Sequence, residues 1–518
     1  MTGAPGDLSR RRFLASGGAL VMSFSLPSAD AEQAKQGSGE AAAVKPIAPG
    51  LPGSLKVQPL LDGWIRIDAD NRITVFTGKA ELGQGIRTAF IQVAAEELVV
   101  PFAAITLVTA DTERTANEGY TAGSHSMQDS GTAIRNAAAQ VRALLLQLAA
   151  DRWSVPTGAL RVANAHVTDG AGRSASYGEI VGTQALHVVA QPTSTFRSTG
   201  ERTLIGKPVA RVDIPGKVTG GVAYVQDLRL PGMVHGRVLR PRSQNAQLAS
   251  LDTASTERLR GVLKVVRDGR FVGVVADKEF TAITAVRTLA TQAAWTDEPS
   301  LPTMTALWQT VAAARSDDYL ILDRTDGVDA PVTGRPTTIP RARDPAPADA
   351  ARTITSTYRK PYQSHGSVGP SCAVAQWVDG KMTVWTHTQG VYPQRAALAE
   401  LLGLPKESVH CIHMEGSGCY GHNGADDVAA DAALLARALP GRPVRVQWMR
   451  EDEHGWEPLG PPMVNTVRAT LDGAGRIVDW HFEVWSQTHN ARPGGAGDLL
   501  AGKHIARAFQ PTPPKPIP

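Results

Sequence analysis

The chain has 518 residues, with 53 basic and 49 acidic side chains and a formal net charge of +4. Hydrophobic residues make up 42% and charged residues 20%, which is typical of a globular protein, and the length predicts roughly three or four domains. The near balance of charge, without a long basic stripe, excludes an evident nucleic-acid-binding surface. The three cysteines (Cys372, Cys411 and Cys419) include no Cys-x-x-Cys pair, so an iron–sulfur cluster with four cysteine ligands is excluded and a disulfide framework is not expected.

The N-terminus carries the pattern of an export signal. Residues 9–14 (Ser-Arg-Arg-Arg-Phe-Leu) precede a short apolar run at 17–26 and an Ala-Asp-Ala sequence at 29–31. The apolar run is too short to cross a bilayer and reads as a signal-peptide core, while the paired arginines resemble a twin-arginine signal. The sequence therefore predicts a twin-arginine signal peptide at residues 1–31 and export to the periplasm. The alternative is a chance basic N-terminus.

The rest of the chain divides by composition into alternating structured and linking segments. Residues 32–57 form a linker, and 58–200 contain expected strands at 64–67, 73–76 and 105–109, with helices at 88–98 and 129–151. Residues 201–297 form a compact α+β unit, residues 298–350 a second linker, and residues 351–510 return to strand–helix alternation. Residues 511–518 are rich in proline. The predicted fold class is mixed α/β (α+β) in several domains.

The most informative stretch is residues 416–424, Gly-Ser-Gly-Cys-Tyr-Gly-His-Asn-Gly. It lies between a predicted strand at 409–414 and a predicted helix at 426–438. Its glycines permit a tight turn and a close approach to a ligand. The helix that follows directs free N–H groups at the loop, which favours an anion such as a phosphate.

Three more segments have a similar form. Glu81-Leu82-Gly83-Gln84-Gly85 joins a strand to a helix, although it is not a dinucleotide fingerprint because Thr88 occupies the third glycine position. Residues 122–126 (Ala-Gly-Ser-His-Ser) precede the long helix, and Gln389 follows the strand at 383–386. Each has a plain structural reading as a glycine turn or an N-cap. Together they indicate one large anionic cofactor.

Two other kinds of site use the same residues. Cys411 with His413, and Cys419 with His422, place two sulfurs and two imidazoles within twelve positions, which is a zinc pattern of unusual spacing. Cys419 is also a candidate nucleophile, since a helix N-terminus lowers the pKa of a thiol. No base can be paired with it from the sequence.

These motifs resemble the molybdopterin-binding large subunit of the xanthine dehydrogenase/aldehyde oxidase family, in the nicotinate dehydrogenase-like or isoquinoline oxidoreductase-like branch. The resemblance extends through residues 78–85, 121–131, 206–236, 388–389 and 416–427. It implies an α/β-hammerhead domain at 201–297 between molybdopterin-binding segments at 58–200 and 351–510. It also implies an oxidoreductase, a molybdenum hydroxylase that oxidises an N-heteroaromatic compound or an aldehyde with oxygen from water.

The resemblance further implies a molybdenum–molybdopterin cytosine dinucleotide cofactor and a partner subunit that carries [2Fe–2S] clusters, with a cytochrome c subunit as a further partner. No metal ligand is predicted in this chain. The residues implied to hold the cofactor are Gly83, Gln84, Gly85, Ser124, His125, Ser126, Gln389, Gly418, Cys419, Tyr420 and Gly421.

Two features depart from the family pattern. Gly369 stands where many relatives have a glutamate, and no second arginine-containing cofactor loop or late general-base glutamate is found before Pro518. We therefore expect a C-terminal remainder of the large subunit as a further partner, and no hydroxylase activity from this polypeptide alone. The alternative function is a non-catalytic remnant that acts as a binding or assembly protein.

Overall fold

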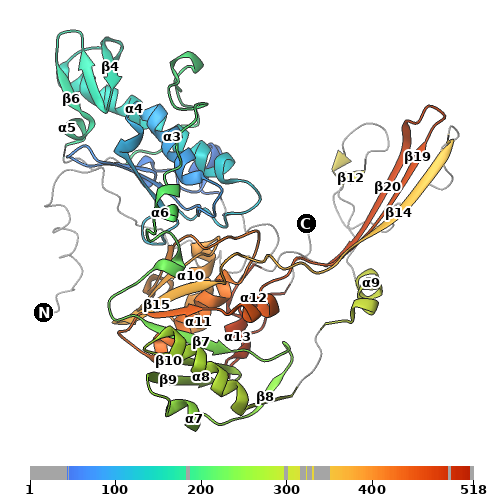
Figure 1. Cartoon of the computed structure of the whole chain (residues 1–518). Helices are drawn as coiled ribbons and strands as arrows, with labels where there is room; N and C mark the ends of the chain where they lie inside the picture. Colours follow the sequence, from blue (N-terminus) through green and yellow to red (C-terminus); the bar gives the residue numbers. More distant parts are fainter. Residues whose placement is uncertain are drawn as a thin grey trace, which may run out of the picture.

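The computed structural model describes residues 44, 46–182, 187–296, 301–314, 322–323, 330–331, 350–487 and 492–513. The described chain forms an N-terminal unit, a central body and a narrow sheet that projects from the body (Figure 1). Helices and strands alternate in the first two parts, so the predicted mixed α/β class is confirmed. The predicted signal peptide and most of the linker at 298–350 lie outside the described residues. Within the part that is described, no helix has both the length and the apolar character needed to cross a membrane.

The N-terminal unit is built on a three-stranded sheet in the order β1 (Ile65–Ile67), β2 (Ile73–Thr77) and β3 (Ile105–Thr109). β2 and β3 are parallel and are connected through α3 (Ile86–Leu98), which packs against α4 (Thr132–Trp153). The predicted strands and helices here are confirmed to within a few residues. Leu55, which the sequence analysis assigned to a linker, is fully buried in this core. The smaller elements of the unit are η1 (Gly53–Lys56), η2 (Leu61–Gly63), η3 (Phe102–Ala104), η4 (Met127–Gly131), η5 (Thr157–Ala159), β4 (Leu160–Ala163), β5 (His166–Asp169), β6 (Ser174–Ser176) and α5 (Tyr177–Val181).

The body is built on one seven-stranded sheet that joins strands from two distant parts of the chain. In spatial order the strands are β17 (Val409–His413), β16 (Lys381–Thr386), β15 (Cys372–Val378), β18 (Val444–Gln447), β7 (Val234–Leu239), β10 (Phe271–Ala276) and β9 (Val262–Asp268). The parallel pairing of β18 with β7 connects segment 351–510 to the predicted hammerhead segment. The two segments therefore share a sheet and a hydrophobic core.

The helix α11 (Ala425–Ala438) lies against this sheet because its sequence is rich in alanine and the strands supply glycines. A Cβ at Gly236 of β7 or at Gly273 of β10 would come within 2.7 Å of the Leu435 side chain. Small residues on both sides thus set the close approach of helix and sheet. The remaining elements are η6 (Thr199–Glu201), α6 (Ile214–Val218), η7 (Val225–Asp227), β8 (Gln247–Leu251), α7 (Ala254–Glu257), α8 (Glu279–Gln292), β11 (Ala293–Thr296), α9 (Met304–Ala312), β12 (Leu322–Asp323), β13 (Ala330–Pro331), α10 (Val391–Leu402), η8 (Lys406–Ser408), α12 (Arg450–Trp456), η9 (Ala496–Asp498) and α13 (Leu500–His504).

The projecting sheet was not predicted. It contains β14 (Arg352–Lys360), β19 (Met463–Leu471) and β20 (Ile477–Ser486), all antiparallel. The sequence predicted strand–helix alternation throughout 353–492. β14 pairs with a strand about a hundred positions further along, and local periodicity does not report such a distant pairing.

Candidate functional site

The four predicted cofactor segments meet where the N-terminal unit faces the body. We name them the Gly-Gln-Gly loop (78–85), the serine loop (121–126), the glutamine loop (387–390) and the glycine loop (416–424). The first two are joined by the backbone N–H of Ala80, which donates to the Thr121 hydroxyl at 2.8 Å. The second and third are joined twice: Thr121 N–H donates to the Gln389 carbonyl at 2.7 Å, and the Gln389 amide Nε2 donates to the Thr121 carbonyl at 2.9 Å.

The third and fourth loops are connected through Asp426, in the first turn of α11. Its carboxylate accepts a hydrogen bond from the Thr388 hydroxyl at 2.5 Å and lies 3.0 Å from His422 Nε2. His413 closes the ring, because its Nδ1 lies 3.1 Å from the Thr388 carbonyl and its Nε2 lies 2.9 Å from the Glu81 carbonyl. The structure therefore brings together all four segments that the sequence singled out.

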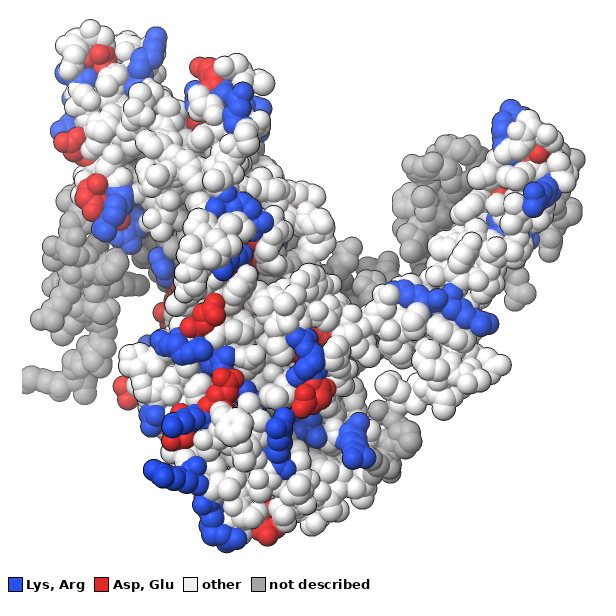
Figure 2. All heavy atoms as spheres, viewed as in Figure 1, with Lys and Arg blue, Asp and Glu red and all other residues white. Residues whose placement is uncertain are grey.

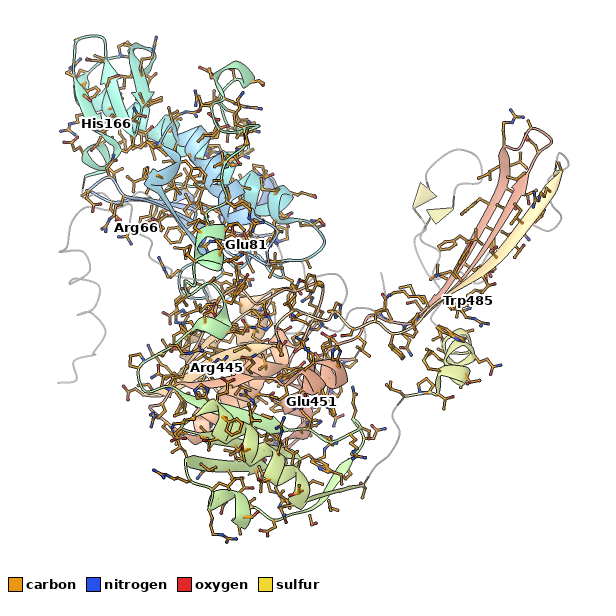
Figure 3. All side chains as sticks on the ribbon, in the orientation of Figure 1. Arg66, Glu81, His166, Arg445, Glu451 and Trp485 are labelled. Atoms are coloured by element: carbon orange, nitrogen blue, oxygen red, sulfur yellow. The ribbon has the colours of Figure 1, made fainter. Side chains whose placement is uncertain are left out.

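In the Gly-Gln-Gly loop, the Glu81 carboxylate occupies the position at which the sequence predicted an external anion. Its Oε1 accepts hydrogen bonds from the backbone N–H groups of Gly83 (2.8 Å) and Gly85 (2.9 Å), and its Oε2 accepts one from Arg87 (3.0 Å). The Glu81 side chain is buried. Figure 3 labels this residue, which lies between the N-terminal unit and the body. A phosphate in this turn would compete with a carboxylate of the protein itself, so the binding of an anion by Gly83 and Gly85 stays a prediction.

Gln84 is engaged within the same loop. Its Oε1 accepts a hydrogen bond from the backbone N–H of Leu82, and its Nε2 donates to the Ala80 carbonyl at 2.9 Å. Both ends of the amide thus stabilise the turn. The role of Gln84 in binding a ligand directly stays a prediction.

The start of α11 is acidic and buried. Asp426 and Asp427 both lie in its first turn, and Asp427 accepts a hydrogen bond from the backbone N–H of Leu500 at 2.7 Å. Burial raises the pKa of Asp427 to about 6. Carboxylates already occupy the positive end of this helix dipole, so a phosphate at this position is not supported.

The serine loop lies at the surface of the protein. Ser124 and His125 are exposed, and the chain turns there through positive φ angles at Gly123 (67°) and Ser124 (61°). Below it, the buried Lys79 ammonium lies 3.5 Å from the Asp129 carboxylate. Of the anion seats predicted from the sequence, this one remains accessible to a phosphate.

The glycine loop borders a cleft of about 520 Å³. Tyr420 projects into it from a left-handed backbone conformation (φ 54°), and 64% of its surface is exposed. The loop is packed tightly from behind, since a Cβ at Gly421 would lie 2.3 Å from the His365 ring and one at Gly416 would lie 2.5 Å from His387. The glycines are thus required by the protein's own side chains. The cleft is lined by Lys360, Gln363, Ser364, His365, Tyr420 and Gly460.

Three buried polar atoms beside this cleft have no hydrogen-bond partner. They are His365 Nδ1, His422 Nδ1 and Glu457 Oε2. The other Glu457 oxygen accepts hydrogen bonds from the Ser364 hydroxyl and the His365 N–H, which ties the cleft wall to the residue that follows α12. Unsatisfied buried atoms cost about 1–3 kcal/mol each, so their clustering fits a polar ligand with both donors and acceptors.

Sequence reasoning missed the residues that hold the loops in shape. Glu81 and Asp426 stand inside or next to the motifs, and a carboxylate among glycine N–H groups is a signal that the turn satisfies itself. His413 was considered only as a metal ligand. Glu457 and His365 carry no local signal, because α12 brings them together from more than ninety positions apart.

The zinc and thiol alternatives lose their support. Cys411 is buried in β17, where burial raises its pKa to about 12, and both ring nitrogens of His413 face carbonyl oxygens. No group of three or more potential metal ligands is found among the described residues. Burial also raises the pKa of Cys419, so the prediction of a helix-activated thiol is wrong.

His387 makes the stability of the site dependent on pH. Burial, and then the nearby His413, lowers its pKa to about 4, against ~6.5 when unfolded. The folded protein therefore favours the neutral ring. The contribution of His387 to the free energy of unfolding is complete above pH ~6.5 and is lost as the pH falls toward ~4. Denaturant titrations at pH 7.5 and pH 4.5 measure how much the free energy of unfolding falls between the two pH values. We expect this fall to be about 2–3 kcal/mol smaller in His387→Gln than in the wild type. Equal losses in the two proteins would contradict this.

Comparisons with known proteins identify the relatives of this chain. Residues 25–210 and 338–502 each match a family model described as a molybdopterin cofactor-binding domain. The chain is 36% identical over 457 residues to one of the subunits of nicotinate dehydrogenase from Pseudomonas putida, an alignment that covers 86% of this chain and 37% of that protein. The chain belongs to the xanthine dehydrogenase/aldehyde oxidase family, among its molybdopterin-binding large subunits.

The chain is also similar to two further proteins. It is 27% identical over 510 residues to the beta subunit of isoquinoline 1-oxidoreductase from Brevundimonas diminuta, which covers 90% of this chain and 62% of that protein. Quinoline 2-oxidoreductase from Pseudomonas putida 86 is a solved structure that is 20% identical, with a TM-score of 0.41, over 54% of this chain and 39% of that one. The chain thus spans 37% and 62% of the length of these two curated relatives.

Proposed function

We propose that this chain is the molybdopterin-binding part of an exported molybdenum hydroxylase that oxidises an N-heteroaromatic compound or an aldehyde, with water as the oxygen source. The observation that carries the proposal is the ring of hydrogen bonds by which Thr121, Gln389, Asp426 and His413 unite four loops from distant parts of the chain. The names of the relatives support an N-heteroaromatic substrate, since nicotinate and isoquinoline are both of that class.

The residues divide into those that face the cofactor and those that hold the loops. The serine loop fits the phosphates of a molybdopterin cytosine dinucleotide, because its backbone is exposed. Gln389 and Gly418–Gly421 fit the polar pterin edge, beside the unpartnered His422 Nδ1. When bound, the molybdenum cofactor supplies two-electron oxidation of a carbon with oxygen from water. Glu81 and Asp426 fix the shape of the walls from behind.

The proposal includes partners. An iron–sulfur subunit with [2Fe–2S] clusters accepts the electrons, and a cytochrome c subunit follows it. The relatives support an assembly of several polypeptides, because their names call them subunits. Export through the twin-arginine route is part of the same proposal and is supported by the paired arginines near the N-terminus.

An isotope experiment tests this function. The tagged chain is purified from its producing host with its associated proteins and is assayed with nicotinate, isoquinoline and an aromatic aldehyde, an artificial electron acceptor and ¹⁸O-labelled water. We expect a hydroxylated or carboxylic product that carries ¹⁸O. If the iron–sulfur subunit is present and none of these compounds is oxidised, the result would instead favour the non-catalytic remnant.

A further inference from the structure

Lys79 is a buried lysine that contacts the chain on both sides of the serine loop. The residue is only 3% exposed. Its ammonium donates hydrogen bonds to the backbone carbonyls of Glu118 (2.9 Å) and Tyr120 (3.3 Å), which come just before the loop. The same ammonium lies 3.5 Å from the carboxylate of Asp129, which comes just after the loop. One side chain therefore holds both ends of residues 121–126.

The side chain of Glu118 connects the same three segments. Its Oε2 accepts hydrogen bonds from the Gly78 N–H at 2.7 Å, the Thr77 hydroxyl at 3.0 Å and the Ser130 hydroxyl at 3.1 Å. The end of β2 and the segments before and after the serine loop thus share one polar cluster, which is buried except at Asp129. We name it the lysine cluster; its members are Thr77, Gly78, Lys79, Glu118, Asp129 and Ser130.

The backbone that the lysine cluster holds is unusual. The serine loop passes through left-handed φ angles at Gly123 and at Ser124, which is not a glycine. The loop is followed by η4, a π-helical turn, and such turns are rare and are found frequently at functional sites. A backbone of this kind persists only when its surroundings fix it. The contacts of Lys79 before and after the loop supply such a constraint.

Neither stability nor charge gives a sufficient reason for a lysine at this position. A buried ion pair adds little to stability, because the cost of desolvation offsets the attraction. The lysine cluster also contains two carboxylates, which oppose the positive charge of Lys79. Figure 2 shows Lys and Arg in small groups among Asp and Glu on the visible face, without one continuous basic area. Phosphate binding by the serine loop would therefore depend on the geometry of its backbone donors.

We propose that Lys79 is a positioning residue of the cofactor site. It fixes the entry and the exit of the serine loop, and so keeps residues 122–126 in the shape that receives a phosphate. Lys79 is itself buried and acts through the loop. This inference rests on the proposed function, in which the serine loop binds the phosphates of the cofactor.

Two variants test this role. Lys79→Met keeps the length of the side chain and removes the ammonium. The double variant Lys79→Met/Asp129→Asn also removes the carboxylate left without its partner, so the net charge of the lysine cluster is unchanged. Both are purified with the partner subunits from a host that makes the cofactor. We expect at least about tenfold less molybdenum and cytosine nucleotide per folded chain in both, which is about 1.4 kcal/mol, close to one hydrogen bond to a charged group.

Leu145→Ala is the control for lost stability. Leu145 is buried in the same unit and lies roughly 20 Å along α4 from the start of that helix. Its truncation leaves a cavity and lowers the denaturant midpoint without removing a contact of the lysine cluster. We expect folded chains of Leu145→Ala to hold as much cofactor as the wild type.

Hydrogen exchange gives a readout that does not depend on the cofactor. The Thr121 N–H donates to the Gln389 carbonyl, and the Asp129 N–H donates to the His125 carbonyl, so both protect segment 119–131. We expect this segment to exchange at least about tenfold faster in the double variant than in the wild type, and α3 to stay within about twofold. Leu145→Ala should not show a change confined to 119–131.

The outcomes are distinct. Loss of cofactor in both Lys79 variants, with faster exchange confined to 119–131, supports the proposal. A double variant that holds as much molybdenum as the wild type overturns it. Equal loss of cofactor in Leu145→Ala, or exchange that rises equally in α3, also overturns it, because stability alone then explains the effect. A wild type that holds no molybdenum in the presence of the iron–sulfur subunit refutes the proposed function, and the inference falls with it.

Discussion

Replacing Glu81 with alanine will lower the free energy of unfolding by roughly 3–5 kcal/mol and will remove bound cofactor from the purified protein. The Glu81 carboxylate accepts three backbone hydrogen bonds in the Gly-Gln-Gly loop and is almost fully buried. Without it, the N–H groups of Gly83, Gly85 and Arg87 lose their acceptor in a place that water reaches poorly. Denaturant titration measures the first effect, and metal analysis measures the second.

Two control variants distinguish the effect of losing the Glu81 carboxylate from a nonspecific loss of stability. Glu81→Gln keeps the volume and the Oε1 acceptor that serves both glycines, so we expect a smaller loss than in Glu81→Ala. Glu407→Ala removes an exposed glutamate from η8 and should change stability by less than about 0.5 kcal/mol. If Glu81→Ala unfolds at the same denaturant concentration as Glu407→Ala, the loop does not depend on this carboxylate.

Replacing Asp426 with alanine should disconnect the glutamine loop from the glycine loop. The substitution removes the acceptor of the Thr388 hydroxyl and the partner of His422 from a buried position. Breaking one partner of a buried charged pair costs roughly 3–5 kcal/mol. We expect a loss of that size in denaturant titrations, together with cofactor loss of at least about tenfold, because the two loops no longer hold one geometry.

The pH profile gives this prediction a second readout. Burial alone would raise the pKa of Asp426, but His422 and the Thr388 hydroxyl together outweigh it, so the pKa is lowered. Its contribution to stability is complete above the unfolded pKa of ~3.9 and is lost as the pH falls through the folded value. Asp426→Ala should therefore flatten the acid limb of the stability curve. Asp379→Asn, in an exposed turn, should leave that limb unchanged; identical limbs in all three proteins would rule out the role given to Asp426.

Much of the site was predictable because its motifs are local. The glycine loop and the helix after it, the serine loop before α4, and Gln389 at the end of β16 each follow from short patterns. The sequence predicted that the loops converge because each of them suits part of one anionic cofactor. The hydrogen bond between Gln389 and Thr121 confirms that the glutamine loop and the serine loop meet. Strand ends and helix starts are where a chain presents unpaired backbone groups, so such segments are readable in sequence.

The features of the site and the fold that the sequence did not predict depend on contacts between residues that are distant in the chain. A helix N-terminus predicts an anion, but it does not reveal whether that anion is a ligand or a carboxylate such as Asp426 or Glu81. The projecting sheet escaped prediction because β14 and β19 come together only in three dimensions. The sharing of one sheet by β18 and β7 was hidden for the same reason.

We propose above all that the four loops form the wall of one molybdopterin site. Its most direct test is the molybdenum and pterin content of the chain, purified with its partner subunits from a host that makes the cofactor. We expect about one molybdenum and one pterin per chain, with a cytosine nucleotide released on denaturation. A preparation in which the iron–sulfur subunit is present and both molybdenum and pterin are absent would contradict it.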